Sequence, residues 1–253
     1  MPVRLAYEEQ GAGDPPLVFV PGWCCDRTLF APQVDHFRRT HRVAALDLRG
    51  CGASPVADDG YDIPAQAADV AALCDDLGLE RAVIVGHSLG GMIGLELAAA
   101  RPELVGAVIG VDPGPIDPLP DVRARFSALA EAIEGESGAE TRRRYVEDLF
   151  LPTDDAGARQ HTLDVMCSVP ARVAAAVLRG AVEWDGVAAL RACAAPILVV
   201  SSQPAGSNAP ERLLALKPEV QVGITFGSGH FNQLVVPEQV NSMIARFVAA
   251  RLT

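Results

Sequence analysis

The sequence of 253 residues contains no apolar run of the roughly 18 residues that a membrane-spanning helix needs. Its opening, M-P-V-R-L-A-Y-E-E-Q, lacks the basic and apolar regions of a secretory signal. Basic residues are in the minority, with 21 Lys and Arg against 32 Asp and Glu, and the net charge of -11 opposes binding to nucleic acid or an anionic membrane. We therefore expect a cytoplasmic protein whose partner is a small-molecule substrate. The oligomeric state stays open, a homo-oligomer included.

Cysteines at metal-ligand spacing are also missing. The six cysteines form no C-x-x-C pair, which argues against a zinc site and against a thioredoxin-like pair. Cys24 and Cys25 are adjacent, but a disulfide between neighbours is strained and a reducing compartment disfavours it. We interpret the cysteines as packing residues and expect no metal site.

Short apolar runs of strand length recur along the chain. They lie at residues 17–20, 43–46, 83–85, 107–111, 197–200 and 220–226. Helical patterns such as 65–77 and 89–100 separate the first four, and this alternation predicts a mostly parallel sheet with helices on both faces. An edge strand is expected at residues 3–7.

The connection between residues 114 and 195 breaks this rhythm, because it is rich in helical patterns and has no convincing strand. Amphipathic helices are expected at 121–134, 140–149 and 171–182, and a closing helix at 238–251. The sequence thus predicts an α/β core of residues 1–115 and 191–253. A helical lid of residues 116–190 is inserted before the last two strands.

The stretch A-V-I-V-G-H-S-L-G-G places Ser88 between a short apolar strand and a helix. Gly86 and Gly90 remove the Cβ atoms that would clash in such a tight bend, so the hydroxyl is exposed above the sheet edge. This G-x-S-x-G pattern predicts a nucleophile elbow. The alternative is a glycine-rich helix start in which the serine is only a cap.

A serine nucleophile needs a base within hydrogen-bond reach, and histidine suits that role. His230 fits best, because F-G-S-G-H-F follows the last predicted strand in a glycine-rich loop. His87 is expected to point away from the site. His161, on the lid, is a weaker candidate for contact with the substrate.

The carboxylate that orients the histidine is less obvious. The usual loop, after the strand at 197–200, contains no Asp or Glu. The loop after the strand at 107–111 carries Asp112, which we assign as the acid. Asp117, Glu183 and Asp185 remain alternatives if the lid folds inward.

Two main-chain amides are the expected oxyanion donors: Leu89 N–H at the helix start, and Trp23 N–H in F-V-P-G-W-C-C. The pocket is expected between the sheet edge and the lid. Its apolar candidates, for which core packing is the alternative, are Trp23, Leu29, Phe150, Met166, Cys167 and Trp184.

Together, P-G-W, the turn D-L-R-G-C-G-A-S at 47–54, G-H-S-L-G-G and G-S-G-H-F resemble the α/β-hydrolase fold superfamily in order and separation. The resemblance covers essentially the whole chain and implies that fold. It also implies a structural role for Asp47 and Arg49. Two departures stand out, namely Pro21 in place of the histidine of an H-G pair, and the acid at Asp112.

Three functions are compatible with these residues. The first is a serine hydrolase that cleaves a small apolar or aromatic carboxylic ester or lactone without a cofactor. The second follows from P-G-W-C, the position of the acid and S-Q-P at 202–204, which are similar to cofactor-independent dioxygenases that cleave N-heteroaromatic rings. That family usually carries a histidine where this chain has Leu89. The third is a non-catalytic small-molecule receptor.

Overall fold

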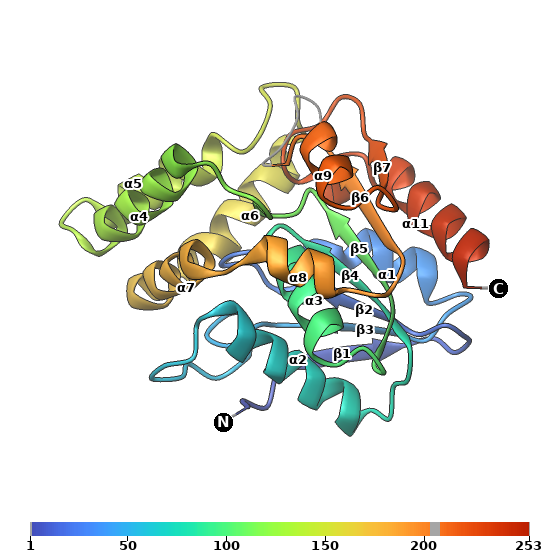
Figure 1. The fold of residues 1–253 in the computed structure, drawn as a ribbon. Coiled ribbons are helices and arrows are strands. Elements are labelled where there is room, and N and C mark those ends of the chain that lie inside the picture. The colour runs from blue at the N-terminus through green and yellow to red at the C-terminus, as the bar shows by residue number, and fades with distance from the viewer. Residues whose placement is uncertain (1, 203–207, 253) are drawn as a thin grey trace.

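The computed structural model describes residues 2–202 and 208–252. Within them, seven strands form one sheet in the order β1-β3-β2-β4-β5-β6-β7 (Figure 1). Strand β1 (Tyr7–Gln10) pairs antiparallel with β3 (Val43–Leu46), and all other neighbouring strands are parallel. The remaining strands are β2 (Leu17–Val20), β4 (Ala82–His87), β5 (Val105–Val111), β6 (Ile197–Ser201) and β7 (Gln221–Ile224).

The edge strand begins later than the sequence predicts. Instead of joining the strand ladder, Val3 N–H donates to Asp69 and Ala6 N–H donates to the Ser54 hydroxyl. The backbone amides of this segment are therefore satisfied by side chains, and strand pairing starts only at Tyr7.

Side chains alternate between the two faces of the sheet, as the two-residue period of a strand requires. In β2, Leu17 and Phe19 join the apolar cluster under α1 (Ala31–Phe37) and α11 (Pro237–Arg251), whereas Val18 and Val20 join the cluster on the other face. That second face is covered by α2 (Ile63–Asp76), α3 (Leu89–Ala100) and α8 (Gly186–Ala192). The continuous apolar runs in the sequence reflect this burial on both sides.

Helices lie between β5 and β6, where the sequence predicts the lid. It consists of α4 (Pro120–Glu134), α5 (Gly138–Glu147), α6 (Ala156–Ser168) and α7 (Ala171–Glu183), which Figure 1 shows as a group apart from α11. Helix α4 packs on α7, and α5 packs on α6. Helix α8 begins inside the range predicted for the lid but packs against α3 of the core.

Three short helices complete the described chain: the 3-10 helix Arg27–Phe30, α9 (Pro210–Leu216) and α10 (Asn232–Val235). Among the described residues, no single helix is long and apolar enough to cross a membrane. Helices α6 and α7 of the described chain would together be long and apolar enough, but the two are bent by 95° at the break between them.

Candidate active site

Ser88 occupies a tight turn between β4 and α3, where its backbone has a φ of 50° and a ψ of -115°. A non-glycine residue adopts such a φ only at a cost, which neighbouring contacts must offset. Added Cβ atoms would lie 2.1 Å from Gly90 O at Gly86, and 2.0 Å from Val20 O at Gly90. Both glycines are thus needed for the close approach of strand and helix, in agreement with an elbow that presents the serine.

Asp112 follows β5 and contacts the candidate base. Its Oδ2 lies 2.6 Å from His230 Nδ1, and its Oδ1 accepts from Ser202 N–H at 2.9 Å. Burial alone would raise the pKa of Asp112, but the hydrogen bond and charge of His230, with the Ser202 amide, outweigh it and hold this pKa below its ordinary value. Asp112 therefore stays ionised and fixes the orientation of the imidazole.

The alternative acids are engaged elsewhere. Asp117 pairs with Arg212, and Asp185 caps α8 by accepting from Ala188 N–H. Glu183 lines a separate surface pocket beside Trp184. Asp112 is thus the predicted acid that the structure brings to His230.

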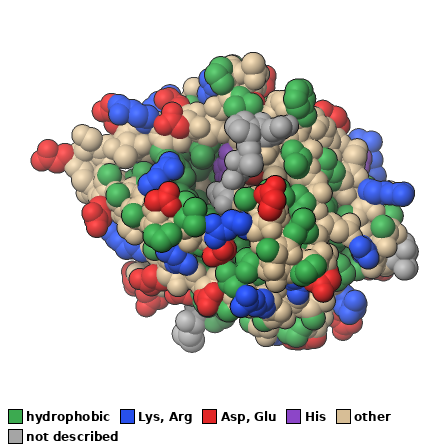
Figure 2. Space-filling view, turned by 45° about the horizontal axis from the view of Figure 1, so that its top comes forward, with side chains coloured by type: hydrophobic (Ala, Val, Ile, Leu, Met, Phe, Trp, Pro, Cys, Tyr) green, Lys and Arg blue, Asp and Glu red, His purple; other side chains and the backbone are tan. Residues whose placement is uncertain are grey.

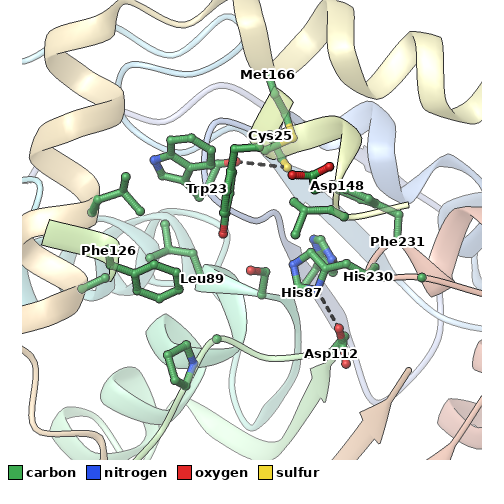
Figure 3. A pocket seen from close by; sticks show the side chains of 18 of the residues that line it. Trp23, Cys25, His87, Leu89, Asp112, Phe126, Asp148, Met166, His230 and Phe231 are labelled. Carbon is green, nitrogen blue, oxygen red and sulfur yellow. Dashed lines mark hydrogen bonds and ion pairs between the residues drawn. The ribbon is translucent and has the colours of Figure 1, made fainter. Parts of the chain in front are cut away.

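Ser88 and His230 line the same cavity, which contains the labelled Asp112–His230 contact in Figure 3. Nδ1 of His230 is occupied by Asp112, which leaves Nε2 for the nucleophile. Among the described residues, Ser88 Oγ makes no hydrogen bond. In enzymes without a bound substrate the bond between nucleophile and base is often long, and it tightens when the substrate binds.

The expectation that His87 points away from the site is wrong. Its ring packs on that of His230 with centroids 4.7 Å apart, and its Nε2 lies 3.0 Å from the His230 carbonyl oxygen (Figure 3). Because a carbonyl only accepts, Nε2 carries the proton. Burial, with the nearby charge of His230, lowers the pKa of His87 to about 3, so this ring is neutral at physiological pH.

The backbone around His230 is also held by the lid. His230 N–H donates to Leu149 O at 2.9 Å, and Gly229 N–H donates to Asp154 Oδ2 at 3.1 Å. Phe150 stacks on Phe231 with centroids 4.8 Å apart. The sequence analysis missed the role of Asp154, although an acid buried to 6% exposure within a polar loop needs a partner.

The two predicted oxyanion donors lie beside the nucleophile. In the described chain, neither Trp23 N–H nor Leu89 N–H donates to a protein acceptor. A Cβ added to Gly22 would lie 3.2 Å from Ser88 Cβ, so the Gly22–Trp23 segment runs directly against the elbow. The Trp23 indole is used separately, since Nε1 donates to Ala174 O of α7 at 2.8 Å.

The cavity between the sheet edge and the lid has a volume of about 550 Å³, and Figure 2 shows the surface hollowed where a histidine side chain is visible. Three of the predicted pocket residues line it: Trp23, Phe150 and Met166. Lid residues that the sequence did not single out add much of the wall. They include Val122, Arg125, Phe126, Tyr145 and Val177.

The other four predicted pocket residues are placed away from the described cavity wall. Leu29 is buried in the core. His161 Nε2 lies 2.8 Å from Thr28 Oγ1 on the surface. Cys167 uses its carbonyl to accept from Arg142, and Trp184 Nε1 donates to Glu96 Oε2 at 2.7 Å on the outer face of α3. Helix periodicity alone does not show which face of a lid helix turns inward.

All six cysteines are free thiols, and five of them are buried. Cys25 also lines the cavity, although the sequence suggested packing alone. Within residues 2–202 and 208–252, no group of three or more His, Cys, Asp or Glu could hold a metal ion. The two predicted scaffold residues both have partners within the chain. Asp47 accepts from Ala53 N–H, and Arg49 pairs with Asp69 at 2.7 Å.

Comparison with known proteins extends these observations. A family model described as the alpha/beta hydrolase fold matches residues 15–237. The chain is 28% identical over 261 residues to the 2-(acetamidomethylene)succinate hydrolase of Mesorhizobium japonicum, covering 98% of this chain and 92% of that protein.

Solved structures show the same likeness. A thermophilic esterase from Thermogutta terrifontis, with malate bound, has a TM-score of 0.87 at 26% identity, covering 98% of this chain and 94% of that one. The enol-lactonase from Burkholderia xenovorans LB400 has a TM-score of 0.82 at 20% identity over 97% and 96% of the two chains, a likeness of fold alone. The family model spans most of the sequence, and the described chain forms one mostly parallel sheet between helices. The protein therefore belongs to the alpha/beta hydrolase fold family.

Proposed function

We propose that the protein is a serine hydrolase that cleaves a small carboxylic ester or lactone through an acyl-enzyme. The observation that carries this proposal is the 2.6 Å contact between His230 Nδ1 and Asp112 Oδ2, in the cavity that Ser88 also lines. A carboxylate so placed fixes the imidazole tautomer and stabilises the imidazolium. The hydrolases and esterases among its relatives support hydrolysis as the class of reaction.

Acylation begins when Ser88 Oγ attacks the carbonyl carbon of the substrate and His230 Nε2 takes the hydroxyl proton. The carbonyl oxygen becomes negatively charged, and the amides of Trp23 and Leu89 donate hydrogen bonds to it. Each such donor typically contributes about 3 kcal/mol of transition-state stabilisation. His230 then gives its proton to the leaving oxygen as the C–O bond breaks, and the acyl group remains on Ser88.

Deacylation uses the same groups in reverse. Water attacks the acyl carbon while His230 Nε2 takes one of its protons. The bond to Ser88 Oγ breaks, the proton returns to that oxygen, and the carboxylic acid leaves. No oxidation state changes, and Ser88 and His230 supply the nucleophile and the base, so the proposed reaction requires no metal and no organic cofactor.

The cavity suits a small substrate with an apolar or aromatic part. Its volume of about 550 Å³ lies within the usual range for small-molecule sites, and Trp23, Phe126 and Phe150 give it flat apolar walls. Relatives are named for an acetamidomethylene succinate and for an enol-lactone, both of which are small.

The ring-cleaving dioxygenase and the non-catalytic receptor are retained only as outcomes of the test. The similar dioxygenases usually carry a histidine directly after the serine position, where this chain has Leu89. Of the S-Q-P sequence, Gln203 and Pro204 lie outside the described residues.

The test is labelling with a serine-directed fluorophosphonate, followed by intact mass, together with turnover of a short-chain aryl ester. We expect one adduct on the wild-type protein, none on Ser88→Ala, and loss of ester turnover in Ser88→Ala and His230→Ala. An unlabelled wild-type protein, or turnover unchanged in Ser88→Ala, contradicts the proposal. Oxygen uptake with a hydroxyquinoline that survives in Ser88→Ala but not in His230→Ala supports the dioxygenase instead.

A further inference from the structure

One basic residue of the lid lines the cavity. Val122, Arg125 and Phe126 of α4 all line it, and positions i, i+3 and i+4 share one face of a helix. Val122 and Phe126 are the apolar residues expected on such a face, and Figure 3 shows Phe126 beside Leu89 at the cavity. Arg125 interrupts this stripe with the only Lys or Arg among the described residues that line the cavity.

Arg125 has no ion pair or hydrogen bond within the described part of the chain, although acids outnumber basic residues by 32 to 21 in the sequence. Other arginines of the lid have structural partners: Arg123 of the same helix donates to Val182 O, and Arg179 pairs with Glu134. Arg125 therefore does not fasten the lid, and its exposed guanidinium is free to meet a ligand at the mouth of the cavity.

A second unused donor lies close by. Tyr145 of α5 lines the cavity and contacts the Trp23 ring edge to face, with centroids 5.7 Å apart. Burial raises the pKa of Tyr145 to about 12, which the charge of Arg125 partly opposes, so the hydroxyl stays protonated at neutral pH. Within the described residues this hydroxyl has no hydrogen-bond partner.

Acid groups restrict where an anion can bind. Asp148, exposed at the end of α5, also lines the cavity and lies beside Cys25 in Figure 3. Asp112 adds a second negative charge on the sheet side. A negatively charged ligand is therefore repelled from those two places and attracted to the part of the wall that holds Arg125.

We propose that Arg125 and the Tyr145 hydroxyl form a subsite for a carboxylate on the lid side of the cavity. The preferred substrates are then esters or lactones that carry a second, ionised carboxyl group remote from the bond that Ser88 attacks. A guanidinium offers two parallel N–H donors that match a carboxylate, and the phenol donates a third hydrogen bond. The reference to substrates rests on the proposed hydrolase function, whereas binding of the anion does not.

The kinetic test uses mono-4-nitrophenyl esters of glutaric, adipic and pimelic acid. Each is matched with a neutral control that keeps the 4-nitrophenyl ester and carries a methyl ester in place of the free carboxyl group. For the best chain length, we expect Arg125→Gln to lower kcat/KM of the acidic ester about 10- to 100-fold, mainly through KM, as for loss of a charge-assisted pair. The neutral ester should change less than about twofold, because it makes no such pair. Arg125→Lys should be intermediate, since it keeps the charge but loses the fork geometry.

Two further variants sharpen the result. Tyr145→Phe should lower kcat/KM of the acidic ester by about 3- to 10-fold, as for one neutral hydrogen bond. Arg191→Gln, which removes an exposed arginine of α8, is the control for a change in net charge and should alter neither ester. The preference for the acidic over the neutral ester should also fall as salt is raised from about 0.05 to about 0.5 M, because the Arg125 guanidinium is partly in solvent and salt screens its charge.

Binding is measured separately from turnover. Calorimetry of adipate with the Ser88→Ala protein should show binding that Arg125→Gln abolishes and that hexanoate, with one carboxylate, does not match. If wild-type protein turns over neither ester, the hydrolase function fails while this measurement still decides the subsite. The subsite is overturned if Arg125→Gln lowers kcat/KM equally for both esters, or if the wild type prefers no acidic ester. It is also overturned if Asp148→Asn lowers kcat/KM of the acidic ester as much as Arg125→Gln does.

Discussion

The floor and the roof of the cavity are held in place by different means. The floor, made of Ser88 and Asp112 at the ends of β4 and β5, is fixed by the main chain: φ is 50° and 40° at these two residues, and Ser88 N–H donates to Val111 O at 3.1 Å. The roof, made of α4 to α7, depends on side-chain packing and a few polar contacts such as Trp23 to Ala174. Backbone geometry thus places the reacting groups, while side chains on helices shape what they meet.

The floor should give the largest effect when it is altered. We expect Asp112→Asn to lower kcat for an aryl ester by about 10⁴-fold, because the amide favours the wrong imidazole tautomer. Steady-state kinetics at neutral pH measures this, and circular dichroism checks the fold. Asp117→Asn, at one of the alternative acids, is the control and should keep activity near that of wild type. A loss of threefold or less in Asp112→Asn would remove the acid assignment.

The seam between roof and floor should give a smaller effect. Asp154→Ala removes the acceptor of Gly229 N–H next to His230, and we expect kcat to fall about tenfold because a small misplacement of a reacting group is costly. The matched control is Asp155→Ala, which removes the cap of α6 and should cost about 1 kcal/mol of stability without altering kcat. Equal kcat in the two variants contradicts a positioning role for Asp154.

Acid should lower the stability of the protein through His87, which lies beside the floor of the cavity. Folded His87 has a pKa of about 3, against 6.5 for the ordinary side chain, so between these values the unfolded chain binds a proton that the folded chain excludes. The contribution of His87 to the free energy of unfolding is therefore fully present above about pH 6.5. It falls with acidification, by up to about 1.4 kcal/mol per pH unit. Urea unfolding at pH 7, 6 and 5 should show a steeper decline for wild type than for His87→Gln. Parallel declines would count against the burial of a neutral imidazole.

The smallest effect is expected outside the cavity. Trp184→Phe removes the hydrogen bond to Glu96 on the outer face of α3 and lies away from the described cavity wall. We expect kcat/KM to stay within about twofold of wild type, with a loss of stability of about 1 kcal/mol for the hydrogen bond. A tenfold change in KM would show that Trp184 contributes to the wall of the cavity.

The same difference explains what could be predicted from sequence. The elbow and the positions of most strands follow from local rules, because only glycine permits the contacts at positions 86 and 90, and apolar runs bounded by turns mark the strands. Asp112 was found by elimination along the sheet edge. These are properties of the main chain, and a linear pattern records them well.

The roof was less predictable. The sequence analysis missed α6, whose residues show little segregation into polar and apolar faces, and it placed Trp184 in the pocket although this residue packs against α3. Arg125 and Tyr145 were not singled out, because they belong to two different helices and only the fold brings both to the cavity. His87 was misjudged since its direction depends on the loop of His230 as well as on β4.

Trp23 has a consequence for experiments in solution. Its peptide N–H is one of the two proposed oxyanion donors, and its indole donates to Ala174 O, so we expect a shift of α7 to displace this amide as well. The sequence contains two tryptophans, and the other, Trp184, is buried away from the described cavity wall, where its indole donates to Glu96 of α3. Replacing Trp184 therefore leaves Trp23 as the one tryptophan, next to α7, and we expect its emission to report any movement of that helix when a ligand binds.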